Sequence, residues 1–427
     1  MTRLAIITTA LTSTLLSLGI ASSSAAETTY LTAAHMVDTV AGRMVDNPAV
    51  VIENGKITAV GTKTSLAAPK GAKRIDLGSK TILPGLIDMH VHITSRADMH
   101  GYRALAVTPV SEAISGVANA AITLRAGYTT VRNVGAGGYT DVALADAIES
   151  GEVPGPRIIP SGPAIGATGG HCDDNLLPHT YNIVGEAVAD GPDAIRAMVR
   201  KVHKYGAKSI KFCATGGVFS KGDTVGGQQY TLEEMTSLVS EAHMLGLKVA
   251  AHAHGASGIK DAIRAGADTI EHASLADEEA FALAKAHGTA FSMDIYNDDY
   301  ILSEGEKVGI LPESLEKERM IGLKQRQTFQ AAFKAGVTMV FGTDAGVYPH
   351  GDNARQFAKM VEWGMTPMQA LQAATTVAAK TLGDLGTDIG AISVGKSADI
   401  IAVNTDPTVN IKTMESVSFV MKSGTVF

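Results

Sequence analysis

The chain has 427 residues, of which 45% are hydrophobic and 19% charged, a composition typical of a globular protein with a sizeable apolar core. Its 36 Lys and Arg against 43 Asp and Glu give a formal net charge of -7, so it lacks the basic excess that favours nucleic acid or anionic membranes. Two cysteines, Cys172 and Cys213, can form neither a disulfide framework nor a cysteine-only zinc site, and their spacing leaves open whether they pair. We therefore expect small-molecule partners, and histidine and carboxylate ligands for any metal.

Residues 1–26 have the three-part layout of a signal peptide. Arg3 is the only charged residue before Glu27, an apolar stretch follows it, and the small residues Ser24 and Ala26 fit the positions before a cleavage site. A membrane anchor is the alternative, although the stretch is short for a span and diluted by Thr and Ser. No later segment has about 18 consecutive apolar residues, so no stable membrane span is expected after signal removal. Export predicts a periplasmic or secreted protein.

Both ends of the mature chain show short strands and turns. Residues 49–60 form β-rich arms around Asn54-Gly55, a dipeptide typical of a hairpin turn. Residues 398–403 and 416–424 repeat this pattern near the C-terminus. We predict that residues 27–82 and 388–427 together build a small β-sandwich domain.

Between these segments, residues 83–387 alternate strand-like apolar runs with helical patterns. Helical stretches include residues 193–205, 232–245 and 367–382. Alternation of this kind, repeated eight times, predicts an α/β fold with a parallel sheet closed into a (β/α)8 TIM barrel; an open doubly wound sheet is the alternative. No GxGxxG follows the first strand, so dinucleotide binding lacks its usual support. The expected strands are residues 82–93, 128–135, 157–162, 207–215, 247–253, 268–273, 289–295 and 337–342.

Six ligand-type residues lie at the ends of five predicted strands, where a parallel barrel carries its reactive groups. Each alone has an ordinary explanation, such as a buried core histidine or a turn-forming aspartate. Strand alternation places the first two on one face, within reach of one ion. Their convergence on one mouth predicts a metal centre. These residues are His90, His92, Lys211, His252, His272 and Asp344.

Several motifs resemble the amidohydrolase superfamily. PGLIDMHVH at residues 84–92, a lysine on the fourth strand, two later histidines and Gly-Thr-Asp at 342–344 match that family's pattern in order and spacing. KFCATGG at 211–217, AHAHG at 251–255 and TIEHA at 269–273 are similar to its dipeptidases, including Xaa-Pro types, and to its members that hydrolyse ochratoxin A. The likeness covers nearly all of the mature chain.

The resemblance implies two Zn²⁺ ions bridged by N6-carboxylysine at Lys211. His90 and His92 would hold one ion with Asp344, whereas His252 and His272 would hold the other. A carbamate converts a long cation into a bidentate anion that can span two metals. The metals would acidify a bridging water, and Asp344 would take its proton and pass it to the leaving amine.

Three further residues are expected to contact the substrate. His254 could compete with His252 as a ligand, but its place beyond the strand end favours a substrate contact. His171, on a loop expected to overhang the mouth, could stabilise the tetrahedral intermediate. The resemblance implies that Tyr230 binds the substrate's free carboxylate, with Arg157 or Lys221 as cationic alternatives.

These expectations define a zinc amide hydrolase that releases a C-terminal amino acid from N-acyl amino acids or dipeptides, including phenylalanine from ochratoxin A. A cyclic-amide or lactone hydrolase of the same fold is one alternative, and a non-catalytic exported zinc- or ligand-binding protein is another. The partner is a small-molecule amide or dipeptide, with no nucleic acid. Relatives of this type imply a homo-oligomer, specifically an octamer.

Overall fold

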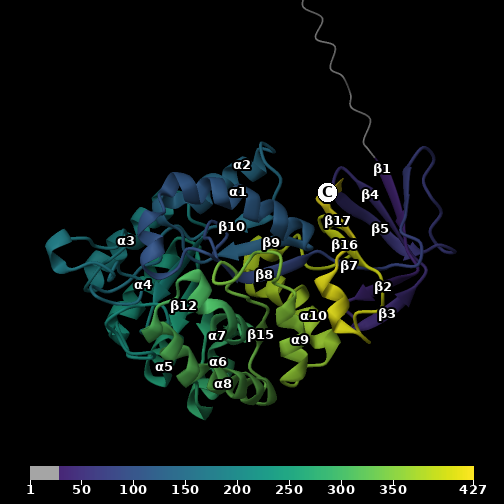
Figure 1. Ribbon diagram of the computed structural model, residues 1–427. Coiled ribbons are helices and arrows are strands. Elements are labelled where there is room, and N and C mark those ends of the chain that lie inside the picture. The colour runs from purple at the N-terminus through teal and green to yellow at the C-terminus, as the bar shows by residue number, and fades with distance from the viewer. Residues whose placement is uncertain (1–27) are drawn as a thin grey trace, which may run out of the picture.

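The computed structural model describes residues 28–427, so the predicted signal peptide lies outside the described residues. Parallel strands and their surrounding helices form the larger part, and sheets from both ends of the chain lie beside it (Figure 1). Among the described residues, no helix is long and apolar enough to cross a membrane.

Eight parallel strands lie in two sheets, and each predicted strand region contains one of them. Isolated parallel bridges, Val91 to Ala345 and Ile165 to Phe212, connect the two sheets at both seams. The arrangement is a TIM-barrel-type α/β fold, with strands grouped as three and five rather than as one continuous closed sheet. The three-stranded sheet contains β8 (Leu86–Val91), β9 (Tyr128–Asn133) and β10 (Arg157–Ile159), and the five-stranded sheet contains β11 (Ser209–Cys213), β12 (Lys248–Ala253), β13 (Thr269–His272), β14 (Ala290–Ser292) and β15 (Met339–Val340).

Helices follow most of these strands and cover the outside of the sheets (Figure 1). The segment 367–382, predicted as one helix, is two, because Thr375 has non-helical angles of φ -138 and ψ -96 and the Ala374 carbonyl accepts from the Ile87 amide of β8. The helices are α1 (Pro109–Arg125), α2 (Thr140–Glu149), α3 (Pro192–Lys204), α4 (Leu232–Met244), α5 (Ala256–Ala265), α6 (Glu278–His287), α7 (Asn297–Val308), α8 (Pro312–Lys334), α9 (Arg355–Glu362), α10 (Pro367–Ala373) and α11 (Thr376–Thr381).

The first predicted strand, residues 82–93, divides at Gly85. β7 (Thr81–Pro84) pairs with strand β16 (Ile400–Val403) from the C-terminal segment, whereas β8 pairs with β9. A side chain at Gly85 would collide with Thr129 of β9, so this close approach requires glycine. The division directs one half of the segment to the terminal sheets and the other half to the site.

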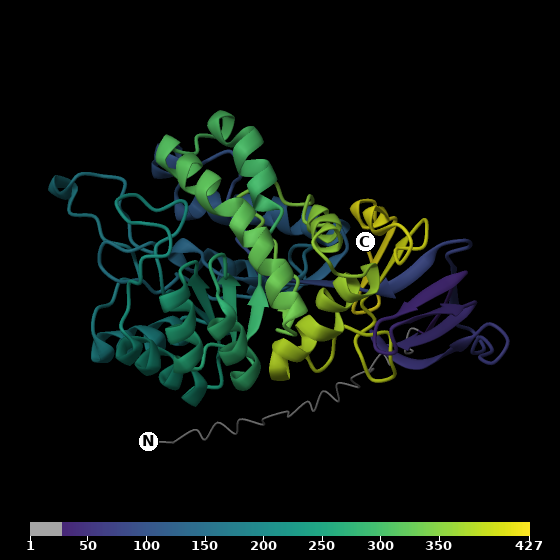
Figure 2. The same ribbon diagram turned by 90° about the horizontal axis from the view of Figure 1, so that it is seen from below.

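The terminal segments form a four-stranded and a six-stranded sheet, as their shared strand pattern predicts. Leu31 and Ile52 of the first sheet pack with Ile82, Ile400 and Met421 of the second in one apolar cluster. Figure 2 shows the purple N-terminal strands beside the yellow C-terminal segment. The exact domain limits stay predictions. The strands are β1 (Thr28–Thr32), β2 (His35–Asp38), β3 (Arg43–Asp46), β4 (Pro48–Glu53), β5 (Lys56–Thr62), β6 (Lys73–Asp76), β7, β16 (Ile400–Val403), β17 (Phe419–Lys422) and β18 (Thr425–Val426).

Candidate active site

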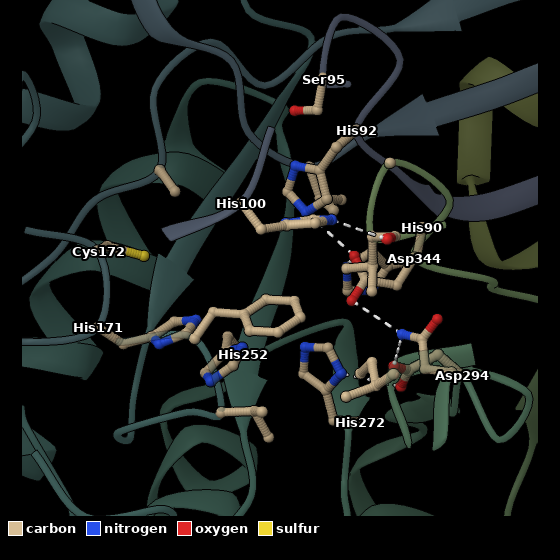
Figure 3. A pocket seen from close by; sticks show the side chains of 18 of the residues that line it. His90, His92, Ser95, His100, His171, Cys172, His252, His272, Asp294 and Asp344 are labelled. Atoms are coloured by element: carbon tan, nitrogen blue, oxygen red, sulfur yellow. Dashed lines mark hydrogen bonds and ion pairs between the residues drawn. The ribbon is translucent and has the colours of Figure 1, made fainter. Parts of the chain in front are cut away.

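A cavity of about 340 Å³ lies at the C-terminal ends of the parallel strands. All six predicted metal ligands line it, and so do His171 and His254. These six residues come from the ends of β8, β12 and β13, from β11, and from the loop that follows β15. Figure 3 shows the imidazoles of His90, His92, His252 and His272 gathered around Asp344 and the space beside it.

Four buried polar atoms of residues that line this cavity lack a hydrogen-bond partner. They are Nε2 of His90, Nε2 of His252, Oδ1 of Asp344 and Oδ1 of Asn297. Buried polar atoms without partners are costly, and their convergence indicates a missing ligand. Two groups of ligand atoms lie within 4.8 Å of one another: His252, His254 and His272, and His90, His272 and Asp344. The residues present therefore fit metal binding.

In three of the cavity histidines, the Nδ1 atom is held by a contact with another residue of the protein. His90 Nδ1 lies 2.9 Å from Glu271 Oε2, and His272 Nδ1 lies 2.8 Å from Asp294 Oδ1. His92 Nδ1 lies 3.1 Å from the Gly135 carbonyl. Such contacts fix the ring orientation and direct Nε2 to the cavity, as in metal-binding histidines.

Lys211 on β11 is 4% exposed, and among the described residues its amine has no hydrogen-bond partner. Burial lowers the pKa of Lys211, aided by the nearby Arg132 guanidinium and opposed by Glu271 and Asp344. A lowered pKa increases the fraction of neutral amine, the form that reacts with carbon dioxide.

Asp344 lies between the two histidines of the first motif. Its Oδ1 is 3.2 Å from His90 Nε2 and 3.3 Å from His92 Nε2, while Oδ2 accepts from Asn297 Nδ2 at 3.1 Å. Burial alone raises the pKa of Asp344, but His90 and His92 hold it well below its usual range. Asp344 also has φ 58, a left-handed conformation uncommon outside glycine and turn-forming residues. This backbone bend turns the carboxylate into the cavity.

Residues 81–427 match the model described as Amidohydrolase family. The chain belongs to the amidohydrolase family. It is therefore a metal-dependent amide hydrolase, and the expected resemblance is confirmed.

Individual amidohydrolases are similar over most of their length. The ochratoxinase of Aspergillus niger is 33% identical over 411 residues, covering 90% of this chain and 84% of that protein. A crystal structure of a Xaa-Pro dipeptidase with methionine bound in its active site has a TM-score of 0.87 and 36% identity, covering 94% of this chain and 100% of that one. The crystal structure of A. niger ochratoxinase has a TM-score of 0.85 and 32% identity, covering 94% of this chain and 96% of that one.

The structure of this amidohydrolase leaves His254 as an alternative ligand. His254 is buried, belongs to one of the two convergent groups, and stacks against His272 with ring centroids 4.7 Å apart. Its Nδ1 lies 2.8 Å from Ser274 Oγ. Burial first, and then the neighbouring His272 and His171, lower the pKa of His254 well below its ordinary value. The ring is therefore neutral and able to ligate or to contact substrate.

His171 lies over the cavity as predicted, stacked on His252 with ring centroids 4.0 Å apart. Its Nδ1 is 2.8 Å from Ser220 Oγ, and that hydroxyl donates to Asp223, which pairs with Lys317. Because Ser220 gives its one proton to the carboxylate, it can only accept from His171 Nδ1–H. The neutral ring then keeps an acceptor at Nε2. Burial lowers the pKa of His171 to about 3, with Asp223 opposing, so the neutral ring predominates.

Tyr230 does not line the cavity, and this corrects its expected role as the carboxylate-binding residue. Its hydroxyl is buried and donates to the Ala189 carbonyl at 2.8 Å, because the residue lies in the core just before α4. The two cationic alternatives also lie elsewhere. Arg157 pairs with Asp399, and Lys221 donates to the Tyr102 hydroxyl. Arg96 is the arginine that lines the cavity.

Four supporting residues were missed by the sequence analysis. Glu271 joins His90 to Arg132, whose Nη2 donates to Glu271 Oε1 at 2.7 Å. Asp294 accepts from His272, Gln325 and Asn297. Asp294 follows the end of β14, so the search for ligand-type residues at strand ends could have found it. Arg132 and Asn297 carry no comparable signal.

Cys172 and Cys213 form a disulfide, with their Cα atoms 5.9 Å apart. Cys213 follows Lys211 by two residues on β11, and Cys172 directly follows His171. The bond therefore ties the loop of His171 to the strand of Lys211, which the spacing in sequence could not reveal.

Proposed function

We propose that this amidohydrolase is a binuclear zinc enzyme that cleaves the amide bond before a C-terminal amino acid, including the phenylalanine amide of ochratoxin A. The observation that carries the proposal is the set of buried, unpaired ligand atoms of His90, His252 and Asp344 beside the buried amine of Lys211. The relatives named as ochratoxinase and Xaa-Pro dipeptidase support this substrate class.

The ligand assignment keeps His90, His92 and Asp344 for one ion and His252 and His272 for the other. Lys211, in a carbamylated form, would provide two anionic oxygens between them. The ions supply Lewis acidity toward the scissile carbonyl and toward the attacking water. The Nδ1 contacts of His90, His92 and His272 hold these rings in the required orientation.

Asp344 is proposed to take a proton from the attacking water and return it to the leaving amine. Asn297, which donates to Asp344 Oδ2, keeps that oxygen directed into the cavity. His171 presents an acceptor at Nε2, which favours a contact with the N–H of the scissile amide over stabilisation of an oxyanion. We assign the substrate carboxylate to Arg96 on the cavity wall, whose Nε and Nη2 donate to Asp98 at 3.1 and 2.8 Å when no substrate is bound.

The direct test is chromatographic. Zinc-loaded protein is incubated with ochratoxin A, with an Xaa-Pro dipeptide and with an Xaa-Phe dipeptide, and the released amino acid is quantified with and without chelator. Chelator-sensitive release of phenylalanine from the toxin is expected. Cleavage of dipeptides alone would refute the toxin assignment, and no release from any substrate would favour the cyclic-amide or lactone alternative.

Asp344→Asn separates catalysis from simple ligand binding. A hydrolase is expected to lose at least about 10²-fold in kcat, because the proton acceptor is removed. An unchanged variant would support the non-catalytic alternative. Export and octamer assembly remain predictions, which N-terminal sequencing of the secreted protein and light scattering would test.

A further inference from the structure

Glu318 has a buried carboxyl group in the wall of the active-site cavity. The proposed mechanism gives this carboxyl no role. It lies on α8, and the side chains that follow it at three and seven residues, Ile321 and Gln325, line the same cavity. Glu318 is 4% exposed. Within residues 28–427, the structure gives its carboxyl neither a hydrogen bond nor an ion pair.

The charged groups that act most strongly on Glu318 are three acidic residues and one cation that is already paired. Asp298, Asp294 and Asp344 are the acidic neighbours. Arg326 is the nearby cation, and its guanidinium is occupied by Asp298 at 3.1 Å and Asp299 at 2.8 Å. Lys317 donates instead to Asp223 and to two loop carbonyls. Among the described residues, the Glu318 carboxyl therefore has no cationic partner of its own.

The same neighbours shift the pKa of the Glu318 carboxyl. Burial first, then Asp298 and Asp294, raise the pKa of Glu318 to about 8, with Arg326 opposing. A buried carboxyl without a partner is expensive to ionise, and a cation placed beside it removes that cost.

A metal ion is a poor match for this position. Neither convergent group of ligand atoms in the described chain includes Glu318. One carboxyl in a wall that also contains Ile301, Ile321 and Val347 suits an organic cation with an apolar body.

We propose that Glu318 forms a subsite for a positively charged group of the substrate, an alkylammonium such as the free α-amino group of a dipeptide. The proposal rests on the proposed function and narrows its substrate class. If the ammonium is the α-amino group, dipeptides with a free N-terminus are better substrates than otherwise identical N-acyl amino acids. Hydrolysis of ochratoxin A, whose acyl group carries no ammonium, is then insensitive to Glu318.

The test compares matched substrates. L-alanyl-L-phenylalanine and N-propionyl-L-phenylalanine differ by one ammonium group on the acyl side. N-propionyl-L-lysine and N-propionyl-L-norleucine differ by one ammonium group on the released residue. The kcat/KM of each is measured for the wild type and for Glu318→Gln, which keeps the side-chain volume.

We expect the wild type to prefer one ammonium substrate over its neutral partner by at least about tenfold, and Glu318→Gln to abolish that preference. The neutral substrates should change less than about twofold. The pair that responds identifies the source of the ammonium. Glu316→Gln is the matched control, because Glu316 is exposed on the same helix and pairs with Arg319; it should leave all four values unchanged.

A wild type that does not discriminate within either pair would overturn the proposal, as would an equal loss for all four compounds in Glu318→Gln. Calorimetric titration of the same compounds into zinc-loaded Asp344→Asn protein measures the preference without turnover. If no compound is hydrolysed, the proposed function fails, and this binding preference still decides the role of Glu318.

Discussion

Lys211 and Lys422 lie at opposite ends of the parallel strands and differ in the partners of their buried amines. Burial lowers the pKa of both side chains, to about 8 for Lys422. Lys422, beside the start of β10, donates to the Gly155 carbonyl, whereas Lys211, at the opposite end, has no hydrogen-bond partner among the described residues. The same residue type is thus structural where its partner is present and available for chemistry where it is absent.

The acidic residues repeat this contrast. Asp399, near the terminal sheets, is buried but pairs with Arg157 and accepts from the Ser423 amide. Asp344, at the cavity, has no arginine beside it, and its Oδ1 lies 3.2 and 3.3 Å from the Nε2 atoms of His90 and His92. Burial therefore does not distinguish the two carboxylates, but the type of partner does: an arginine for Asp399, and imidazoles able to bind a metal for Asp344.

The largest effect is expected from the lysine pair. Lys211→Ala should remove the bridge between the proposed ions and lower kcat/KM by at least about a thousandfold, since metal stabilisation of the transition state is worth several kcal/mol. Lys422→Met is the matched control and should keep its metal. Metal content by mass spectrometry and steady-state kinetics check both. Two bound ions and full activity in Lys211→Ala would contradict the bridging role of Lys211.

A second pair compares carboxylates that each bind a buried or half-buried arginine. Glu271→Gln and Asp399→Asn should both lower the melting temperature, because each leaves an arginine without its anion. Glu271→Gln should in addition lower zinc affinity about 10- to 100-fold, since it removes the partner of His90 Nδ1. Zinc titration against a competing chelator measures this difference. Equal zinc affinity in the two variants would contradict the role of Glu271.

A smaller effect on kcat is expected from the residues that orient the His171 ring. Asp223→Asn weakens the contact that fixes the Ser220 hydroxyl and, through it, the His171 ring, so kcat should fall about tenfold. Asp174→Asn, an exposed change in the same loop as His171, serves as the control. The same kcat in both variants would show that the ring orientation does not depend on Asp223.

The smallest change in activity is expected from the disulfide. Replacing Cys172 and Cys213 together by serine should lower the free energy of unfolding by about 2–4 kcal/mol, because the closed loop no longer restricts the unfolded chain. Activity should fall less than about tenfold, since the ligands come from strand ends. Urea denaturation and kinetics measure the two effects. An unchanged free energy of unfolding would rule out a stabilising bond.

The sequence predicted the parts of this molecule that depend on local pattern. Alternating β and α segments identified the parallel strands, and the strand-end residues predicted as ligands all line one cavity, because chain direction alone brings those ends together. The prediction that Tyr230 lies in the cavity was wrong. The conformation of a few residues before α4 decides whether its ring faces the cavity or the core, and the sequence pattern does not show that conformation. Glu318 and Asn297 carried no signal, since their significance depends on packing between elements distant in the chain.

The most direct test of a binuclear centre is anomalous X-ray scattering at the zinc edge from crystals of the zinc-loaded protein. Two peaks are expected, one among His90, His92 and Asp344 and one beside His252 and His272, with Lys211 between them. A single peak, or none, in crystals of fully active protein would contradict a binuclear centre at this site.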